Sequence, residues 1–393
     1  MNLSVKDVFN KLSDYCELEG YKGWDPYDGL NSKIFQSLPF RKNSLIRLAW
    51  IQLFKRNPLN LRKLLIIQKD YNPKALGLFL SGECQNYLRE PSLKTTERID
   101  FFINKLIELK SEGYSGACWG YNFDWQSRAF YQPKFTPTIV VTSYVANALL
   151  DAYEIFQDNT QLLELARSSC DFILSDLNRT VDLDGNFSFS YSPMDNTVVF
   201  NASLLGSRLL ARVYNITKED ILFDAAQKSV KYCVNHQNSN GSWVYGTLQF
   251  HQWIDNFHTG FNLECLSDYV KYSGDDSVQL NIDQGLKYYL ENFFTTEGIS
   301  KYYNNKIYPV DIHAPAQLVI ILSKLHLLDK NRELVDTVLN WTINNLWNKK
   351  GYFYYQKKRW IITKIPYMRW SQSWMYLSLS WYLKTVVKNG IKD

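Results

Sequence analysis

Apolar residues recur along most of the chain with the spacing of an α-helix, and this pattern itself repeats. In one clear stretch Val141, Val145, Ala148, Ala152 and Ile155 follow one another at three or four residues, which places them on one helix face. Similar stretches of small and apolar residues begin near positions 142, 201, 258, 313 and 370. The intervals between these starts are 59, 57, 55 and 57 residues, so we infer an internal helical repeat.

Each repeat is expected to hold a second, more polar helix, over about 160–177, 218–236, 276–294 and 330–347. The N-terminal part is more degenerate and predicts helices near 43–56, 73–88 and 98–111. Long loops rich in Gly, Trp, Tyr and Asn separate the helix pairs. Repeated helical hairpins stack into an open solenoid or close into a toroid. Because only alternate turns are long and aromatic, we expect an all-α, (α/α)6-type toroid with these loops on one face.

The repeat period also bears on domain organisation. Six units of about 57 residues account for most of the chain, and the remainder precedes them. We therefore expect residues 1–393 to form a single α/α-toroid domain, in which residues 1–40 are an N-terminal extension that packs near the cleft.

Composition narrows the function classes. The net charge is only +5 and no dense Lys/Arg block occurs, so we expect no nucleic-acid partner. The sequence lacks a signal-peptide pattern and an apolar run of 18 residues, which predicts no export and no membrane insertion. Six cysteines without CxxC spacing favour a reducing compartment, the cytoplasm, with no metal, no cofactor and no disulfide. The oligomeric state is left open.

Several sequence words resemble those of the α/α-toroid superfamily, which includes glycoside hydrolases, polysaccharide lyases, sugar epimerases and squalene-type cyclases. At finer grain the segments Gly23–Gly29 (GWDPYDG), Asp311–His313 (DIH) and Arg369–Trp374 (RWSQSW) are similar to toroid proteins encoded among surface-polysaccharide genes. Gln237–Trp243 (QNSNGSW) fits the QxxxGxW repeat word of the cyclases, in which the Gln caps a helix end and the Trp stacks in the loop. The cyclase acid motif DxDD is absent, so a terpene-cyclase or prenyltransferase-like activity is only a minor alternative.

Polar residues at the starts of the first helices of the hairpins should face the central cleft. The repeat therefore nominates a catalytic group: Asp255, His258, Asp124, His313 and Arg369. The aromatic loops, together with the turn at 23–29, nominate a substrate-binding group: Trp24, Asp25, Asp28, Trp119, Tyr121, Trp125, Arg128, Asp195, Asn201, His251, Asp311, Gln372 and Trp374. Trp and Tyr faces suit sugar rings, and Asp, Asn and Arg suit sugar hydroxyls.

These residues suit a carbohydrate-active, glycoside-hydrolase-like enzyme that acts on a surface or extracellular polysaccharide in a central cleft. A uronic-acid C5-epimerase or a polysaccharide lyase is the alternative. Glycoside hydrolysis needs two carboxyl groups flanking the scissile bond, and the aspartates are the available pool. Uronic-acid C5-epimerisation and polysaccharide elimination need a His or Tyr base, with Arg to neutralise the sugar carboxylate. A non-catalytic glycan-binding toroid is the alternative of a different class.

Overall fold

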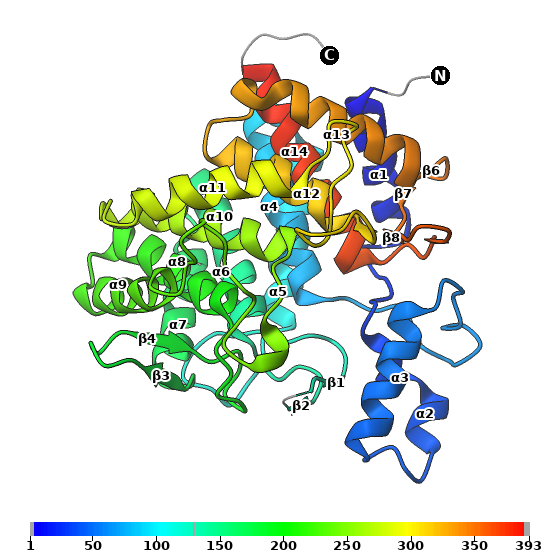
Figure 1. Cartoon of the computed structure of the whole chain (residues 1–393), viewed down its shortest axis with the longest axis horizontal. Helices are drawn as coiled ribbons and strands as arrows, with labels where there is room; N and C mark the ends of the chain where they lie inside the picture. Colours follow the sequence, from blue (N-terminus) through cyan, green and yellow to red (C-terminus); the bar gives the residue numbers. More distant parts are fainter. Residues whose placement is uncertain (1–3, 129, 389–393) are drawn as a thin grey trace.

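A computed structural model describes residues 4–128 and 130–388. The centre of this part of the chain is a closed ring of inner helices: α4 (Pro73–Arg89), α6 (Ile139–Ile155), α8 (Phe200–Thr217), α10 (Asn256–Ser273), α12 (His313–Lys324) and α14 (Ser373–Lys388). Each inner helix packs on the next, and α14 packs back on α4 (Figure 1). The predicted all-α toroid is therefore confirmed, and the predicted first helices of the hairpins are its inner wall.

A second layer of helices covers the ring from outside: α5 (Leu93–Glu108), α7 (Thr160–Ser175), α9 (Asp220–Val234), α11 (Gln279–Phe293) and α13 (Arg332–Leu346). Each of them packs on the inner helix that precedes it in the chain. The inner helices are buried nearly all round, whereas the outer ones bury one face and expose the other. This difference is why the inner helices read as continuous apolar stretches and the outer ones as amphipathic.

The N-terminal helix α1 (Val5–Leu18) completes the outer layer by packing against α14. A capping box formed by Ser4 and Asp7 starts it, and Val8, Leu12 and Cys16 bury one face. Residues 5–18 thus lie in the outer layer, while Tyr27, further along the expected extension 1–40, lines the cavity. Helices α14 and α1, which come from opposite parts of the chain, form the sixth pair of inner and outer helices.

The following segment forms a small lobe beside the ring, seen at the lower right of Figure 1. It contains the 3-10 turn η1 (Asp28–Asn31), the short helix α2 (Lys33–Ser37) and α3 (Ser44–Arg56). Leu30, Phe35 and Ile51 form its own apolar cluster. The expected boundary at residue 40 falls inside this lobe, and the helix predicted over 43–56 belongs to it and not to the ring.

Short β-strands form within the loops that connect the helices of the ring. They form the hairpins β1–β2 (Trp125–Gln126, Tyr131–Gln132), β3–β4 (Arg179–Val181, Phe187–Phe189) and β6–β7 (Trp347–Asn348, Tyr352–Phe353), and the antiparallel sheet β5–β8–β9 (Val310–Asp311, Gln356–Lys357, Ile362–Thr363). Three single-turn elements complete the chain: η2 (Gln249–His251), η3 (Asp329–Asn331) and the π-helical turn η4 (Met368–Gln372). Among the described residues, none of the helices is both long and apolar enough to cross a membrane.

Closure of the ring by α1 can be tested at one buried side chain. Leu12 is fully buried in the interface of α1, whereas Leu18 on the same helix is 88% exposed. We expect Leu12→Ala to lower the free energy of unfolding by about 2–5 kcal/mol, because it leaves a cavity in the core. Leu18→Ala is the matched control and should change it by less than about 0.5 kcal/mol. Urea denaturation measures both, and equal effects would contradict the packing of α1 against the ring.

Candidate functional site

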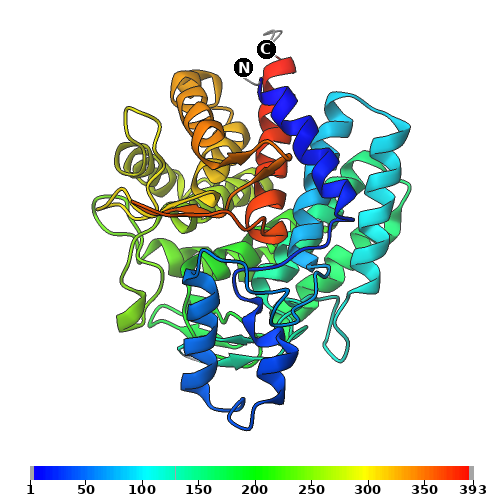
Figure 2. The same cartoon turned by 90° about the vertical axis from the view of Figure 1, so that its right-hand side faces the viewer.

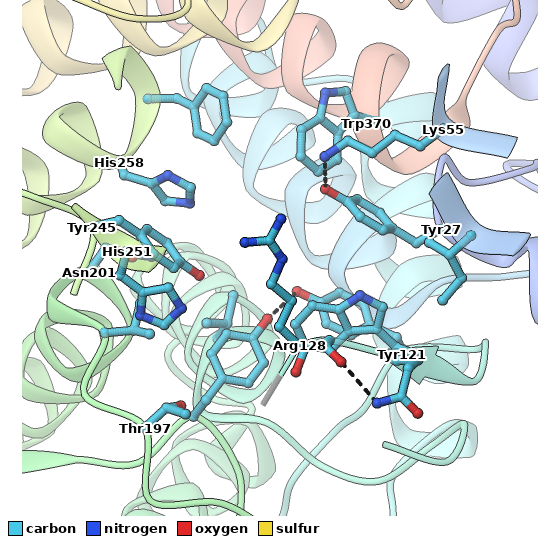
Figure 3. A pocket seen from close by; sticks show the side chains of 18 of the residues that line it. Tyr27, Lys55, Tyr121, Arg128, Thr197, Asn201, Tyr245, His251, His258 and Trp370 are labelled. Atoms are coloured by element: carbon cyan, nitrogen blue, oxygen red, sulfur yellow. Dashed lines mark hydrogen bonds between the residues drawn. The ribbon is translucent and has the colours of Figure 1, made fainter. Parts of the chain in front are cut away.

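A cavity of about 490 Å³ lies where the inner helices begin. Its wall includes a residue from the start of every inner helix and a stripe of α3 from the lobe: Lys74, Val140, Asn201, His258, His313 and Arg369, with Leu48, Gln52 and Lys55. Figure 3 shows Asn201, His258 and Lys55 around this space, together with aromatic side chains such as Tyr27, Tyr245 and Trp370. The prediction that the inner helix N-termini share one face is confirmed, and the lobe closes one side of that face.

His258 is held in a fixed orientation by Asp255. The Asp255 carboxylate caps α10 by accepting the backbone N–H of His258 at 2.9 Å. It also receives the Trp253 indole N–H at 2.9 Å and lies 2.7 Å from His258 Nδ1. Because the carboxylate can only accept, Nδ1 is the nitrogen that donates to it, and Nε2 is the ring nitrogen left to act on a ligand. The carboxylate is buried, while the imidazole reaches the cavity.

Tyr245 lies next to this imidazole and supplies a phenol to the same space. Its ring stacks on Trp253 with centroids 4.7 Å apart and lies 4.6 Å from the ring of His258. Figure 3 shows its hydroxyl pointing into the cavity. Burial raises the pKa of Tyr245, with the charge of Asp255 adding to the effect. The phenol therefore stays protonated at neutral pH and suits proton donation, not proton abstraction.

His313 and His251 are neutral members of the wall. Burial lowers the pKa of His313 well below its ordinary range, and nearby Lys74 and Arg369 add to the shift. Burial also lowers the pKa of His251, and His258 contributes. Within the described part of the chain, both ring nitrogens of His313, Nδ1 of His251 and Oδ1 of Asn201 lack a hydrogen-bond partner. Buried polar atoms that line a cavity without a partner are typical of a polar-ligand site.

Lys74 places an unpaired amine at the cavity wall. It is only 4% exposed, and its Nζ lies 4.3 Å from the centroid of the Tyr144 ring and 5.3 Å from that of Trp374. Among the described residues its amine has no carboxylate partner. Burial lowers its pKa well below the ordinary range, and the charge of Arg369 lowers it further. The site thus holds a buried amine that has no carboxylate partner among the described residues.

Three more cations face the same space. The Arg128 guanidinium projects into the cavity in Figure 3, and it lies 5.8 Å from the Phe250 ring. Lys55 donates a hydrogen bond of 2.7 Å to the hydroxyl of Tyr27. Arg369 also lines the wall, but a bidentate pair with the buried Asp25 compensates its charge. In contrast, none of the described residues that line the cavity is Asp or Glu. The cavity is therefore electropositive.

The structure divides the nominated residues into two groups. One group lines the cavity: Tyr121, Trp125, Arg128, Asn201, His251, His258, His313 and Arg369. The other lies behind the wall or outside it: Trp24, Asp25, Asp28, Trp119, Asp124, Asp195, Asp255, Asp311, Gln372 and Trp374. Every nominated aspartate is in the second group, so Asp124 and Asp255 do not line the cavity themselves, although Asp255 holds His258, which does.

The aspartates behind the wall are occupied by structural hydrogen bonds. Asp28 pairs with the buried Arg62 at 2.8 Å and fixes the lobe. Asp195 closes a turn through Ser192 and Thr197, and Asp124 accepts the backbone N–H of Lys134 at 2.8 Å. Such carboxylates are acceptors for nearby backbone N–H groups.

Asp311 lies beneath Trp370 and His313. It accepts the indole N–H of Trp370 at 2.9 Å and the backbone N–H of His313 at 3.0 Å. Burial raises its pKa to about 6, yet its side chain is fully covered. It positions two residues of the wall and does not reach the cavity.

Several nominated aromatic and amide side chains are core residues. Trp119 is fully buried and donates its indole N–H to the carbonyl of Leu106 at 2.7 Å. Trp24 donates in the same way to Ile67 at 2.9 Å. Gln372 bonds the backbone of Phe353 through both ends of its amide, and Trp374 supports the ring of His313 from behind. We expected these four side chains to stack on a sugar or to bind its hydroxyls. In the structure they pack in the core and bond to the protein backbone or to neighbouring rings.

The QxxxGxW word is structural, but its contacts differ from the Gln helix cap and stacked Trp that the resemblance implies. Gln237 donates to the carbonyl of Gly241 at 2.9 Å and to that of Asn281 at 3.0 Å. Trp243 is buried and donates to the carbonyl of Cys233 at 3.1 Å. These bonds fix the loop between Gln237 and Trp243 to the outer helices. The motif is therefore no evidence for terpene chemistry.

Sequence reasoning missed part of the wall: Tyr27, Lys55, Lys74, Tyr191, Tyr245 and Trp370. A signal existed for Lys74, because Asn72-Pro73 is a helix-start pair and places the lysine in the first turn of α4. Tyr27 lies within the nominated turn at 23–29. No sequence signal marks Lys55, since its helix was expected in the ring. Among the described residues, no group of three or more His, Cys, Asp or Glu has the arrangement of a metal site.

Comparisons with known proteins agree with the fold. No known family matches the sequence, and no curated protein does. Among solved structures, the cellobiose 2-epimerase of Bacillus thermoamylovorans aligns over 81% of this chain and 88% of its own, with 11% identity and a TM-score of 0.63. A GH76 α-mannanase of Bacteroides thetaiotaomicron covers 82% and 88%, with 14% identity and a TM-score of 0.61. A polysaccharide lyase covers 98% and 97%, with 11% identity and a TM-score of 0.61. The fold is that of the α/α-toroid proteins.

The lowered pKa of Lys74 can be tested through the pH dependence of the free energy of unfolding. Lys74 binds fewer protons in the folded protein than in the unfolded chain, because its folded pKa is lowered. Stability should therefore rise with pH between the folded pKa and the unfolded value, with a slope of up to about 1.4 kcal/mol per pH unit. Lys74→Met should be more stable than the wild type at neutral pH, and the difference should shrink as the pH approaches about 10.4.

Chemical denaturation across this pH range measures the difference. Lys287→Met, at an exposed position of α11, is the control and should follow the wild type. A pH-independent difference between Lys74→Met and the wild type would show that Lys74 keeps an ordinary pKa.

Proposed function

We propose that this protein is a carbohydrate-active enzyme that abstracts a proton from an acidic sugar, as a uronic-acid epimerase or a polysaccharide lyase. The observation that carries the proposal is the wall of the cavity. It presents an oriented imidazole, unpaired cations and aromatic rings, and its described residues include no carboxylate. The sequence words that resemble those of surface-polysaccharide proteins favour a surface or extracellular polysaccharide as substrate.

The cations account for the first requirement of this chemistry. A hydrogen next to a carboxylate is removed only when the charge that develops on that carboxylate is stabilised. Arg128 and Lys74 have no carboxylate partner among the described residues, so both are available to the sugar carboxylate. Lys74 becomes protonated as the anion binds, because the new negative charge raises its pKa.

His258 and Tyr245 account for the proton transfers. His258 Nε2 takes the proton from C5 of the uronate, and Asp255 stabilises the imidazolium that forms. In elimination the C5 electron pair forms the C4–C5 double bond, and the sugar oxygen at C4 leaves with a proton from Tyr245. In epimerisation a phenol on the other side of the sugar donates its own proton to the opposite face of C5, and the proton taken from C5 stays on His258 until it exchanges with water. Both outcomes share the first step, and the aromatic wall offers faces for the sugar rings.

Glycoside hydrolysis is the second candidate, since a mannanase is among the similar structures. It needs one carboxylic acid and one carboxylate on either side of the glycosidic bond. Here Asp255 is bound to His258, Asp25 is paired with Arg369, and Asp311 lies beneath Trp370. Because none of these three carboxyl groups lines the cavity, the geometry favours proton abstraction.

The role of His258 is tested by His258→Asn. We expect turnover of uronate-containing oligosaccharides to fall by about 10²–10⁴-fold, because the base is lost while the size of the side chain is nearly kept. Asp255→Asn keeps a helix cap and should be comparably damaging, because it removes the charge that orients the imidazole. Ultraviolet absorbance detects the unsaturated product of elimination, and proton NMR detects the epimer.

The matched control is His326→Asn, an exposed histidine beyond the C-terminal end of α12. Its turnover should equal that of the wild type. Full activity of His258→Asn would exclude His258 as the base.

The preference for acidic sugars is tested at Arg128. Loss of a charge-assisted hydrogen bond is worth about 1.5–3 kcal/mol, so Arg128→Gln should lower kcat/KM for a uronate substrate by about 10–100-fold. Binding of a neutral oligosaccharide of the same length should change little. Arg179→Gln, on the exposed strand β3, serves as the control. An equal loss of affinity for both sugars would argue against recognition of the carboxylate by Arg128.

A further inference from the structure

A strongly basic and apolar surface lies beside the cleft. From Gly29 to Lys69 the sequence contains no Asp or Glu, and the same holds from Thr337 to Lys392. The net charge of the whole chain is only +5, so the positive charge is concentrated in these two segments. They include the lobe and the hairpin β8–β9, respectively.

The fold brings the two segments together. Lys358, in the turn of the hairpin, donates a hydrogen bond of 3.0 Å to the carbonyl of Arg56 at the C-terminal end of α3. Figure 2 shows the hairpin, in orange-red, just above the blue helix of the lobe. The basic runs that are separate in the sequence thus form one surface. We call it the basic face and define it by eight residues: Leu53, Arg56, Leu59, Lys63, Leu64, Arg359, Trp360 and Ile361.

Large apolar side chains project from the basic face. Trp360 is 84% exposed, Leu64 73% and Leu59 68%. Leu53 and Ile361, one on α3 and one in the hairpin, are about half exposed. Large apolar side chains exposed on segments that a hydrogen bond joins are typical of an interaction surface.

The cations of the basic face are free to meet a partner. Within the described part of the chain, Arg56, Lys63 and Arg359 have no carboxylate partner, and all three are exposed. Arg359 lies over the ring of Trp360, 5.0 Å from its centroid. A tryptophan with adjacent cations is the combination found where proteins enter the headgroup region of a membrane.

The basic face borders the mouth of the cavity. Leu48, Gln52 and Lys55 of α3 line the cavity, while Leu45, Leu53 and Arg56 on the neighbouring stripe of the same helix are exposed. Residues one helical stripe apart are adjacent on the surface. A partner bound to the basic face therefore sits at the rim of the cleft.

We propose that the basic face docks this protein on an anionic lipid bilayer. Cations supply the attraction to the lipid headgroups, and the leucines, Ile361 and Trp360 enter the interface. A second copy of the chain fits less well, because a two-fold contact would place the same cations opposite each other. A soluble polyanionic glycan would engage the cations but leave the exposed aliphatic side chains in water.

Flotation of the full chain with lipid vesicles tests the proposal. One set is phosphatidylcholine alone, and the other is phosphatidylcholine mixed two to one with phosphatidylglycerol. We expect binding only to the anionic vesicles and weakening of that binding by salt. The double substitution R359E/W360S should reduce the bound fraction at least about ten-fold, because it reverses one charge and removes the aromatic anchor.

The matched control is K287E/L280S on α11, which makes the same changes of charge and polarity at exposed positions far from the basic face. It should bind vesicles like the wild type, and both variants should melt at the wild-type temperature. His258→Asn should also bind normally, so that failure of the proposed catalysis and failure of docking give different results.

Three results would overturn the proposal. The first is no binding of the wild type to anionic vesicles at low salt. The second is an equal loss in R359E/W360S and K287E/L280S, which would mean that only net charge matters. The third is a vesicle-independent role of the face, seen as loss of polygalacturonate binding or of a dimer in R359E/W360S while vesicle binding is retained.

Discussion

The convergence of six inner helix N-termini on one cavity is the constraint on which the rest of this structure depends. Each helix start presents unpaired backbone N–H groups and a partial positive charge. In many proteins an aspartate at the N-cap offsets the partial positive charge of the helix start. Here the caps of the inner helices α4 to α12 are Asn72, Thr138, Val199, Asp255 and Ile312. Only Asp255 among them is acidic, and its charge is directed to His258.

This single acidic cap links stability to chemistry. Asp255 caps α10 with one carboxylate oxygen and fixes the imidazole of His258 with the other, so the orientation of His258 follows from how the helix begins. The guanidinium of Arg128 adds to the remaining positive potential. A buried amine such as Lys74 lowers the stability of the fold when it is charged and has no anionic partner. Its presence at the cavity wall is consistent with a site that binds an anion. The fold alone does not dictate this function, since toroids carry different chemistries.

Much of the ring was predictable because its signal is periodic. The starts near 142, 201, 258, 313 and 370 coincide with inner helices, since each inner helix repeats the same burial. The helix α1 was not predicted, because it belongs to the ring only through its contact with α14, at the other end of the chain. The lobe was misplaced for a similar reason, as α3 has a helical pattern but packs outside the ring.

The candidate site was predicted less well. His258, Arg128 and Tyr121 line the cavity as expected, but an aspartate that caps a helix and one that faces a cleft occupy the same sequence position. Asp195, Asp255 and Asp311 turn toward backbone N–H groups, and this direction depends on local rotamers that the sequence pattern does not encode.

The most direct test of the account is to run the reaction in heavy-oxygen water and to weigh the products by mass spectrometry. Proton abstraction predicts sugar products without the heavy label, whereas the heavy oxygen at a new reducing end would mean hydrolysis and contradict the account.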